Sequence, residues 1–479
     1  MRLVRTFVLP LFLFCILLFA NAAIAQNWPM LNYCKERTSW ASDETVLHPP
    51  LEKKTEYITT IPAPSISDMS FFNNFLTLAI QGDPNTLEVF DISAGDTAWI
   101  FKLPGSRGSM SFTCAQNDSL IFAGGQYGEG LYALDRETGR QRWFKPIGPL
   151  FTRNVILDST RAYILGDSLY CLNIENGATI WTYKLNLQST PALDNSYVYV
   201  VGDRKIRIFD KNTGELLWSR YTSPTTSGAI TVDESNFYTF SNDTVFAFHK
   251  KNQRIKWFYQ RPNDTLQVNS QNSFAITNDK LCFTIGRNKK ESKGQLVTVE
   301  KETGEFIWEQ TFNCDFLFAP AIANNVVYLV SGERALYGFD LETGEQLFYD
   351  KSISYKGQPI VANHKLFVAS TYKVVVFGNT ETKVDNENQQ LTEGFRLLQN
   401  HPNPFNNQTI INFGIPQSEH VTLTIYNYLG QKVTTLANRR FSAGLHQVKF
   451  TGDALPGGLY FYKINAGPFT ATRKLVLLK

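Results

Sequence analysis

The sequence has little excess charge of either sign. Its 46 Lys and Arg residues stand against 43 Asp and Glu residues, so the formal net charge is only +3 over 479 residues. Proteins that gather nucleic acid or an anionic membrane by electrostatic attraction carry a strong basic field, which a net charge this small does not supply. The composition therefore predicts no nucleic-acid partner.

Histidine and cysteine are also scarce. Six histidines are scattered singly, and no H-E-x-x-H, H-x-H or EF-hand spacing occurs. Of the six cysteines, five lie after residue 25, and they form neither a C-x-x-C pair nor an even disulfide framework. We expect these cysteines to be small buried apolar residues. The sequence predicts no catalytic, metal-binding or cofactor-binding residues.

Long apolar runs are missing after residue 19. The first 25 residues contain Arg2 and Arg5, an apolar run from Phe7 to Phe19, and the small-residue ending Ala23-Ile24-Ala25. This order is typical of a secretory signal peptide. The run is shorter than the roughly 20 residues that a membrane span needs. We therefore expect residues 1–25 to be a signal peptide and the mature chain to have no transmembrane segment.

The chain does contain a repeat in which each tryptophan lies four residues after a glycine, in the unit L-Y-x-L-D-x-x-T-G-x-x-x-W. The fifth copy departs most, with His249 and Gln253 where the acid and the glycine belong. The copies are Leu87–Trp99, Leu131–Trp143, Leu169–Trp181, Ile206–Trp218, Val245–Trp257, Leu296–Trp308 and Leu336–Phe348, and an eighth begins at Val374–Gly378 and stops.

The chemistry of this unit predicts its structure. An alternating strand enters the D-x-x-T-G turn, where the aspartate accepts backbone hydrogen bonds and the glycine takes a positive φ, and a second strand follows. Two more strand-like runs separate successive units. A period of about 40 residues with four short antiparallel strands is typical of a β-propeller blade. We predict an all-β chain with an eight-bladed propeller over residues 53–378, preceded by a lead-in over residues 26–52.

The eighth copy lacks its last strand. The segment Lys54 to Ile61 has no upstream partner and can supply that strand, which would close the ring with the N-terminal end of the chain. We expect Tyr57 to take the tryptophan's place there. The residues predicted to dock one blade on the next are Trp99, Trp143, Trp181, Trp218, Trp257, Trp308, Phe348 and Tyr57.

This repeat resembles the quinoprotein-like (PQQ-type) repeat, and the resemblance covers residues 28 to 378. It implies a propeller in which the tryptophan of one blade packs on its neighbour. Enzymes of this type use pyrroloquinoline quinone with calcium, and often carry two adjacent cysteines over the cofactor. No two cysteines are adjacent in this sequence.

The last part of the chain has a different pattern. A polar linker over residues 379–394 leads to residues 395–479, where short alternating strands separated by Pro and Gly predict a small antiparallel β-sandwich of the Ig-like kind. This tail closely resembles the type A sorting domain of type IX secretion substrates. The matching residues are Pro402, Asn403, Pro404, Phe405, Tyr426, Asn427, Gly430, Gln431, Gly458, Tyr460, Arg473 and Lys474.

The sorting-domain resemblance implies the type IX secretion machinery as a partner. It also implies export through the periplasm of a Gram-negative bacterium, to the outer-membrane surface or the medium.

For the propeller, the leading hypothesis is a noncatalytic module whose blade-connecting loops bind an extracellular protein, glycan or small ligand. A basic loop with Arg287, Lys289, Lys290 and Lys293 is a candidate patch. The first alternative is a quinone-dependent dehydrogenase or another propeller enzyme that uses the propeller axis. The second is an outer-membrane assembly scaffold resembling the propeller lipoproteins, although bulky Phe14 before Cys15 does not fit a lipid-attachment site.

Overall fold

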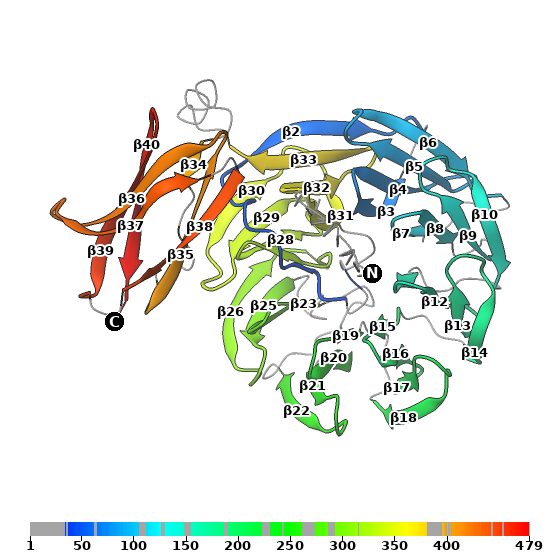
Figure 1. Ribbon diagram of the computed structural model, residues 1–479. Helices are drawn as coiled ribbons and strands as arrows, with labels where there is room; N and C mark the ends of the chain where they lie inside the picture. Colours follow the sequence, from blue (N-terminus) through cyan, green and yellow to red (C-terminus); the bar gives the residue numbers. More distant parts are fainter. Residues whose placement is uncertain are drawn as a thin grey trace, which may run out of the picture. The chain divides into compact units, whose positions relative to one another are not determined.

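The computed structural model describes residues 34, 37–61, 65–104, 112–125, 130–147, 155–185, 190–222, 230–241, 244–260, 274–285, 293–314, 316–380, 395–397, 400, 403, 405–441, 444–452 and 455–478. It divides the chain into two compact units, Met1–Thr380 and Glu381–Lys479 (Figure 1). All elements of the described residues are β-strands.

The first unit is an eight-bladed β-propeller. Each blade has four strands, to which the short strand β1 (Trp40–Ala41) is added in blade 7, and the sheets follow one another around a common centre (Figure 1). Blades 1 to 4 contain β3 (Ser65–Phe72), β4 (Phe75–Gln81), β5 (Thr86–Asp91), β6 (Asp96–Lys102), β7 (Phe112–Gln116), β8 (Leu120–Gly125), β9 (Gly130–Asp135), β10 (Gln141–Pro146), β11 (Ile156–Leu157), β12 (Arg161–Leu165), β13 (Leu169–Asn173), β14 (Thr179–Tyr183), β15 (Ala192–Leu193), β16 (Tyr197–Gly202), β17 (Lys205–Asp210) and β18 (Leu216–Tyr221).

The remaining blades continue this order. Blades 5 to 7 contain β19 (Ile230–Val232), β20 (Asn236–Ser241), β21 (Thr244–His249), β22 (Ile255–Gln260), β23 (Phe274–Ile276), β24 (Lys280–Ile285), β25 (Gly294–Glu300), β26 (Phe306–Phe312), β27 (Ala321–Ala323), β28 (Val326–Val330), β29 (Leu336–Asp340) and β30 (Gln346–Asp350). Blade 8 contains β31 (Lys356–Ala362), β32 (Lys365–Ala369), β33 (Lys373–Asn379) and, from the other end of the unit, β2 (Leu51–Ile58).

Strand position within a blade explains the hydrophobic pattern of each strand. In β28 all five residues are buried, whereas β6, at the outer edge of blade 1, alternates between exposed and half-buried residues. The second and third strands are covered on both faces by the neighbouring blades, so they are nearly continuously apolar. The fourth strands lie at the rim, and only the inward half of their residues packs against a neighbour.

The N-terminal strand closes the ring, as the sequence analysis expects. Strand β2 pairs antiparallel with β33, and the register runs from Leu51 opposite Asn379 to Ile58 opposite Lys373. Strand β2 thus becomes the fourth strand of blade 8. Pairing the last strand of the propeller in this way covers a sheet edge that would otherwise be open.

Tyr57 does not take the tryptophan's place, contrary to our expectation. In the other blades the tryptophan directly follows a β-bulge in the fourth strand, and in β2 the residue in that position is Thr55. Tyr57 pairs two residues further along, with Val374, and its ring packs on Phe90 of blade 1 with centroids 5.5 Å apart. An aromatic residue at either position can reach the next blade, so the aromatic pattern alone does not determine the register.

The second unit is a small antiparallel β domain, as predicted. One sheet contains β34 (Arg396–Leu397), β35 (Gln408–Ile415) and β38 (Gly444–Thr451). The other has the order β37 (Lys432–Phe441), β36 (Glu419–Asn427), β39 (Gly458–Ala466) and β40 (Phe469–Leu477). Buried residues of both sheets, including Phe413, Phe450, Leu423 and Ile464, form one core.

Candidate functional site

The repeat tryptophans lie at the contacts between blades. The indole Nε1 of Trp99 donates to the Arg136 carbonyl oxygen at 2.8 Å, and that of Trp308 donates to the Leu341 carbonyl oxygen at 2.9 Å. Each acceptor is the residue after the acid in the D-x-x-T-G turn of the following blade. The same bond joins Trp143 to Ile174, Trp181 to Lys211 and Trp257 to Lys301, and the Phe348 ring packs on Phe377.

The glycine of the turn leaves room for the indole of the preceding blade. A Cβ at Gly304 would lie 2.6 Å from the Trp257 ring, and a Cβ at Gly139 would lie 2.6 Å from the Trp99 ring. Both glycines also have positive φ values of 74° and 68°. The glycine of the repeat therefore has two roles. It forms the turn within its own blade, and it contacts the tryptophan of the preceding blade.

In two blades the turn does not have a glycine in contact with a tryptophan of the preceding blade. Gly95 in blade 1 has a φ of 74° but nothing within 4 Å of an added Cβ, which agrees with Thr55 holding the tryptophan position of blade 8. Blade 5 has Gln253 at a φ of 53° where other blades have glycine. Trp218 of blade 4 is half-buried, and its ring packs on Phe237 of blade 5 with centroids 6.3 Å apart.

This contrast predicts the result of a matched pair of substitutions. Gly304→Ala should lower the free energy of unfolding by about 3 kcal/mol, because the methyl group is strained at positive φ and also displaces Trp257. Gly95→Ala should cost only about 1 kcal/mol, because strain alone applies there. Denaturant titration followed by tryptophan fluorescence measures both values. Equal losses would show that the indole contact adds nothing.

Half-buried ion pairs also join blades 3 to 6. Lys211 Nζ lies 2.8 Å from Asp158 Oδ2, Lys250 Nζ lies 2.6 Å from Asp194 Oδ2, and Lys301 Nζ lies 3.4 Å from Asp233 Oδ2. In each pair the aspartate belongs to the turn between the first two strands of one blade, and the lysine belongs to the next blade. A tyrosine five residues after each aspartate, Tyr163, Tyr199 or Tyr238, donates its hydroxyl to the same carboxylate.

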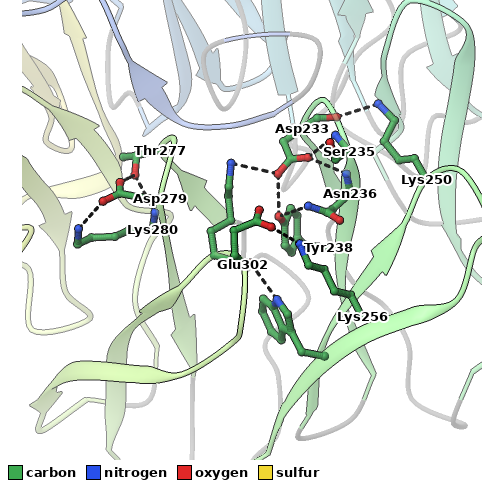
Figure 2. A network of polar contacts seen from close by, with 12 residues as sticks. Asp233, Ser235, Asn236, Tyr238, Lys250, Lys256, Thr277, Asp279, Lys280 and Glu302 are labelled. Atoms are coloured by element: carbon green, nitrogen blue, oxygen red, sulfur yellow. Dashed lines mark hydrogen bonds and ion pairs between the residues drawn. The ribbon is translucent and has the colours of Figure 1, made fainter.

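Figure 2 shows the last of these Tyr-Asp-Lys groups. Asp233 accepts hydrogen bonds from the Tyr238 hydroxyl at 2.7 Å and from the backbone N–H of Asn236, while Lys250 donates to the Asp233 carbonyl oxygen at 2.8 Å. Lys250 therefore contacts the aspartates of two successive blades. Sequence analysis missed these groups, although the recurring aspartate and the lysine after the turn acid are visible once the copies are aligned.

Hydrogen bonding keeps these half-buried carboxyls charged. Burial alone would raise the pKa of Asp194, but hydrogen bonds from Lys250, the Ser196 backbone N–H and Tyr199 lower the pKa below its ordinary value of 3.8. Burial raises the pKa of the Tyr199 hydroxyl, and the negative charge of Asp194 raises it further. The tyrosine thus stays a donor and the aspartate an acceptor.

The pKa direction gives a pH-dependent prediction. Because the pKa of Asp194 is lower in the folded chain, its stabilisation is complete above pH 3.8 and is lost as the pH falls through the folded value. Asp194→Asn should therefore cost about 3 kcal/mol at neutral pH, and less as the pH drops below 3.8. The control is Asp203→Asn, with little expected effect, because the Asp203 carboxylate that pairs with Arg207 is itself exposed to solvent. A pH-independent difference between Asp194→Asn and wild type would contradict this account.

The lead-in runs along the inner strands of blades 4 to 8. Arg37 donates to the carbonyl oxygens of Thr190 and Ile230 at 3.1 and 3.4 Å, and the Thr38 carbonyl oxygen accepts from the Ile276 backbone N–H. Strand β1 (Trp40–Ala41) then pairs parallel with β27. These contacts follow the ring blade by blade, and Figure 1 shows the segment near its centre.

Buried polar side chains anchor the lead-in against the inner strands. Only 4% of Arg37 is exposed, and burial lowers the pKa of its guanidinium to about 10. Glu44 is also buried, and its carboxylate accepts hydrogen bonds from the backbone N–H groups of Val46 and Leu47. His364 Nδ1 of blade 8 lies 3.1 Å from the same carboxylate. Sequence analysis placed the lead-in before the propeller and did not predict its path inside the ring.

Of the candidate basic loop, only Lys293 lies in the described part of the chain, where it is exposed; Arg287, Lys289 and Lys290 lie outside it. Within the described ranges, no three His, Cys, Asp or Glu side chains are grouped as a metal site would require. The same ranges contain no helix with the length and hydrophobicity of a membrane span. Cys114, Cys171, Cys282 and Cys314 are buried free thiols, and Cys34 is half-buried with its Sγ 3.2 Å from the Thr38 hydroxyl.

In the second unit, the entry segment of the sorting motif packs on the last strand. Asn403 Oδ1 accepts from the Val476 N–H at 2.8 Å, and the backbone of Phe405 bonds to both Val476 and Leu478. The Phe405 ring is buried against Phe450. Pro402 and Pro404 lie outside the described residues.

Other sorting-motif residues shape turns and strand contacts. Asn427 Oδ1 accepts from the N–H groups of Leu429 and Gln431, and Gly430 has a φ of 77° in that turn. The Tyr460 hydroxyl donates to the Pro456 carbonyl oxygen, and Arg473 Nε donates to the Leu397 carbonyl oxygen. Gly458, Tyr426 and Lys474 lie on β39, β36 and β40.

Sequence profiles of two families match this chain. The profile described as outer membrane protein assembly factor BamB, which consists of PQQ-type repeats, matches residues 165–290 and 285–396. The profile of the secretion system C-terminal sorting domain matches residues 400–478.

Two curated relatives have low identity. The tetrathionate hydrolase of Acidithiobacillus ferrooxidans is 22% identical over 291 residues, which are 54% of this chain and 56% of the hydrolase. The assembly factor BamB of Shewanella oneidensis is 24% identical over 321 residues, which are 58% of this chain and 76% of BamB. The chain thus spans little more than half the length of the hydrolase.

Solved structures share the propeller fold. BamB of Moraxella catarrhalis has a TM-score of 0.54 at 17% identity, covering 68% of this chain and 99% of BamB. The quinohemoprotein alcohol dehydrogenase ADHIIG of Pseudomonas putida HK5 has a TM-score of 0.59 at 11% identity, covering 74% and 81%. The chain therefore carries BamB-like β-propeller repeats of the PQQ type followed by a type IX sorting domain, which indicates secretion or attachment to the cell surface of a Gram-negative bacterium.

Proposed function

We propose that the propeller is a noncatalytic binding module, delivered outside the outer membrane, whose blade-connecting loops bind a protein, a glycan or a small ligand. The observation that carries this proposal is the path of the lead-in. Arg37, Thr38 and Ser39 bond to the inner edges of successive blades, so the chain itself occupies the inner rim that an axial cofactor would use. The blade-connecting loops then remain as the surface that can bind a ligand.

Binding screens with the mature chain test this proposal. We expect saturable binding to a component of a printed glycan array or to an extracellular protein in a pull-down. Binding should survive Arg37→Met, because that residue is buried against the inner strands and is not on a blade-connecting loop. A heat-unfolded sample should show no binding. Deleting residues 287–293 tests the basic loop separately, and unchanged binding would remove that loop from the site.

Quinone-dependent oxidation is the first alternative, favoured by the shared fold with quinohemoprotein alcohol dehydrogenase. The mature chain is incubated with pyrroloquinoline quinone and calcium, and reduction of an artificial dye is followed with alcohol substrates. A parallel incubation with tetrathionate addresses the hydrolase relative. We expect no turnover above a heat-inactivated control. If the chain shows turnover, and a substitution that leaves it folded abolishes that turnover, the propeller is an enzyme and the binding proposal is wrong.

A scaffold in outer-membrane assembly is the second alternative, favoured by the BamB profile and structure. Deleting the gene in its host distinguishes it from an extracellular binding module. A scaffold would leave outer-membrane proteins depleted in the mutant, whereas we expect their abundance to be unchanged. Quantitative proteomics of outer-membrane fractions measures the difference.

A further inference from the structure

Positive charge is concentrated in the sorting domain. Residues 395–479 contain nine Lys and Arg against two Asp and Glu, whereas residues 1–394 contain 37 against 41. The small net charge of the whole chain therefore combines a basic tail with a slightly acidic remainder. A surface of opposite sign would attract the tail and not the rest of the chain.

Some of this charge lies beside aromatic rings on one face of a sheet. Tyr426 on β36 pairs with Lys432 on β37 and with Phe461 on β39, and Phe461 pairs with Lys474 on β40. Lys463 lies in the adjacent row, opposite Thr424. Directly paired residues of an antiparallel sheet project from the same face, so these five side chains form one surface, here called the basic aromatic face.

The basic aromatic face points away from the domain core. The alternate residues of the same strands, Ile425, Tyr462 and Leu475, are buried in the core shared with the other sheet. On the basic aromatic face itself, Tyr426 and Phe461 are half-buried, while Lys432 and Lys474 are exposed. The face thus presents flat apolar rings bordered by ammonium groups.

The sorting motif itself separates into two classes of residue. Phe405, Asn427 and Tyr460 have internal partners that build the domain, as their contacts show. Tyr426 and Lys474 project from the outward face of the sheet. A motif residue on an outward face is placed for recognition by another molecule rather than for packing of its own core.

We propose that the basic aromatic face is the surface by which the sorting domain docks on an acidic protein of the type IX secretion machinery. Aromatic rings supply contact area at the centre of such an interface, and the lysines supply orientation and a faster association. Residues 1–394 have no excess of Lys and Arg, with 37 against 41 Asp and Glu, so only the tail offers an acidic partner a basic surface. This inference rests on the assignment of residues 400–478 as a sorting domain.

Charge reversal in the full-length chain, expressed in a host with a type IX system, tests the proposal. Lys463→Glu lies on the basic aromatic face, and Lys449→Glu on β38 of the other sheet is the matched control with the same change in charge. We expect Lys463→Glu to lower the surface-delivered fraction severalfold and Lys432→Glu with Lys463→Glu to lower it at least tenfold, with folded protein retained in the periplasm. Lys449→Glu should leave delivery unchanged. Thermal melting of each purified variant checks that the domain still folds.

Two outcomes would overturn the proposal. Equal loss of delivery in Lys449→Glu and Lys463→Glu would assign the effect to overall charge rather than to this face. Sedimentation of the wild-type chain with vesicles of phosphatidylglycerol and phosphatidylcholine, lost in Lys432→Glu with Lys463→Glu, would assign the face to anionic lipid instead of a protein. If a chain ending at Thr380 also reaches the surface, the sorting assignment itself fails, which distinguishes that failure from the failure of the docking face.

Discussion

A chain that begins at Thr59 should fail to fold into a cooperative propeller. Without β2, the edge of β33 is unpaired, and the buried side chains of Leu47, Leu51 and Tyr57 are lost from the core. The inner strands of blades 4 to 8 also lose their hydrogen bonds to the lead-in. The combined loss is a large fraction of the 5 to about 15 kcal/mol that stabilises a typical domain. Circular dichroism melting and binding of a hydrophobic dye measure the effect.

A second N-terminal truncation separates ring closure by β2 from the contacts that the lead-in makes with the inner strands. A chain that begins at Pro50 keeps β2 and lacks only the lead-in. We expect it to fold with one cooperative transition at a lower melting temperature, because Arg37, Glu44 and β1 no longer bridge the blades. If the chain beginning at Thr59 melted like the full mature chain, closure by the N-terminal strand would not be needed for stability.

Removing the sorting domain should have the opposite effect, with normal folding and no delivery. The two units divide at Thr380, and the Thr380 N–H donates to the Pro50 carbonyl oxygen, so a chain that ends at Thr380 keeps every described contact of β33 with β2. We expect its propeller to melt at an unchanged temperature. In a host with a type IX system, this chain should accumulate in the periplasm, because it lacks the domain that the machinery handles.

The reciprocal experiment uses residues 381–479 fused to a periplasmic reporter that is not normally exported further. The fusion should appear at the cell surface or in the medium, and the same fusion in a strain without the type IX system should stay in the periplasm. Protease accessibility of intact cells and fractionation measure both proteins. Surface delivery of the chain ending at Thr380 would show that the propeller contains its own export signal.

Much of the propeller was predictable because its information is local. Each D-x-x-T-G turn and the tryptophan after it lie within 13 consecutive residues, as in Leu296–Trp308, so strand period and turn chemistry identify every copy. Ring closure by the N-terminal strand was also predictable from the sequence. The eighth repeat copy lacks its last strand, and the segment before the first blade has no strand of its own to pair with. The exact register of β2 did not follow, because Thr55 and Tyr57 fit the alternation equally well and only the bulge after Lys53 decides between them.

The sequence alone determined the number of blades, the closing strand and the two-part organisation, because these depend on repeat spacing and turn residues that neighbours in the chain encode. Only the tertiary structure decided which side chains meet across the ring. Arg37 reaches Ile230 across 193 residues, and Glu44 meets His364 across 320 residues. No local pattern specifies such pairs, because they form only when all eight blades close and bring the inner strands of the propeller around the lead-in. The basic aromatic face depends on tertiary structure for the same reason, since the register of four strands places Lys432, Phe461 and Lys474 in one row.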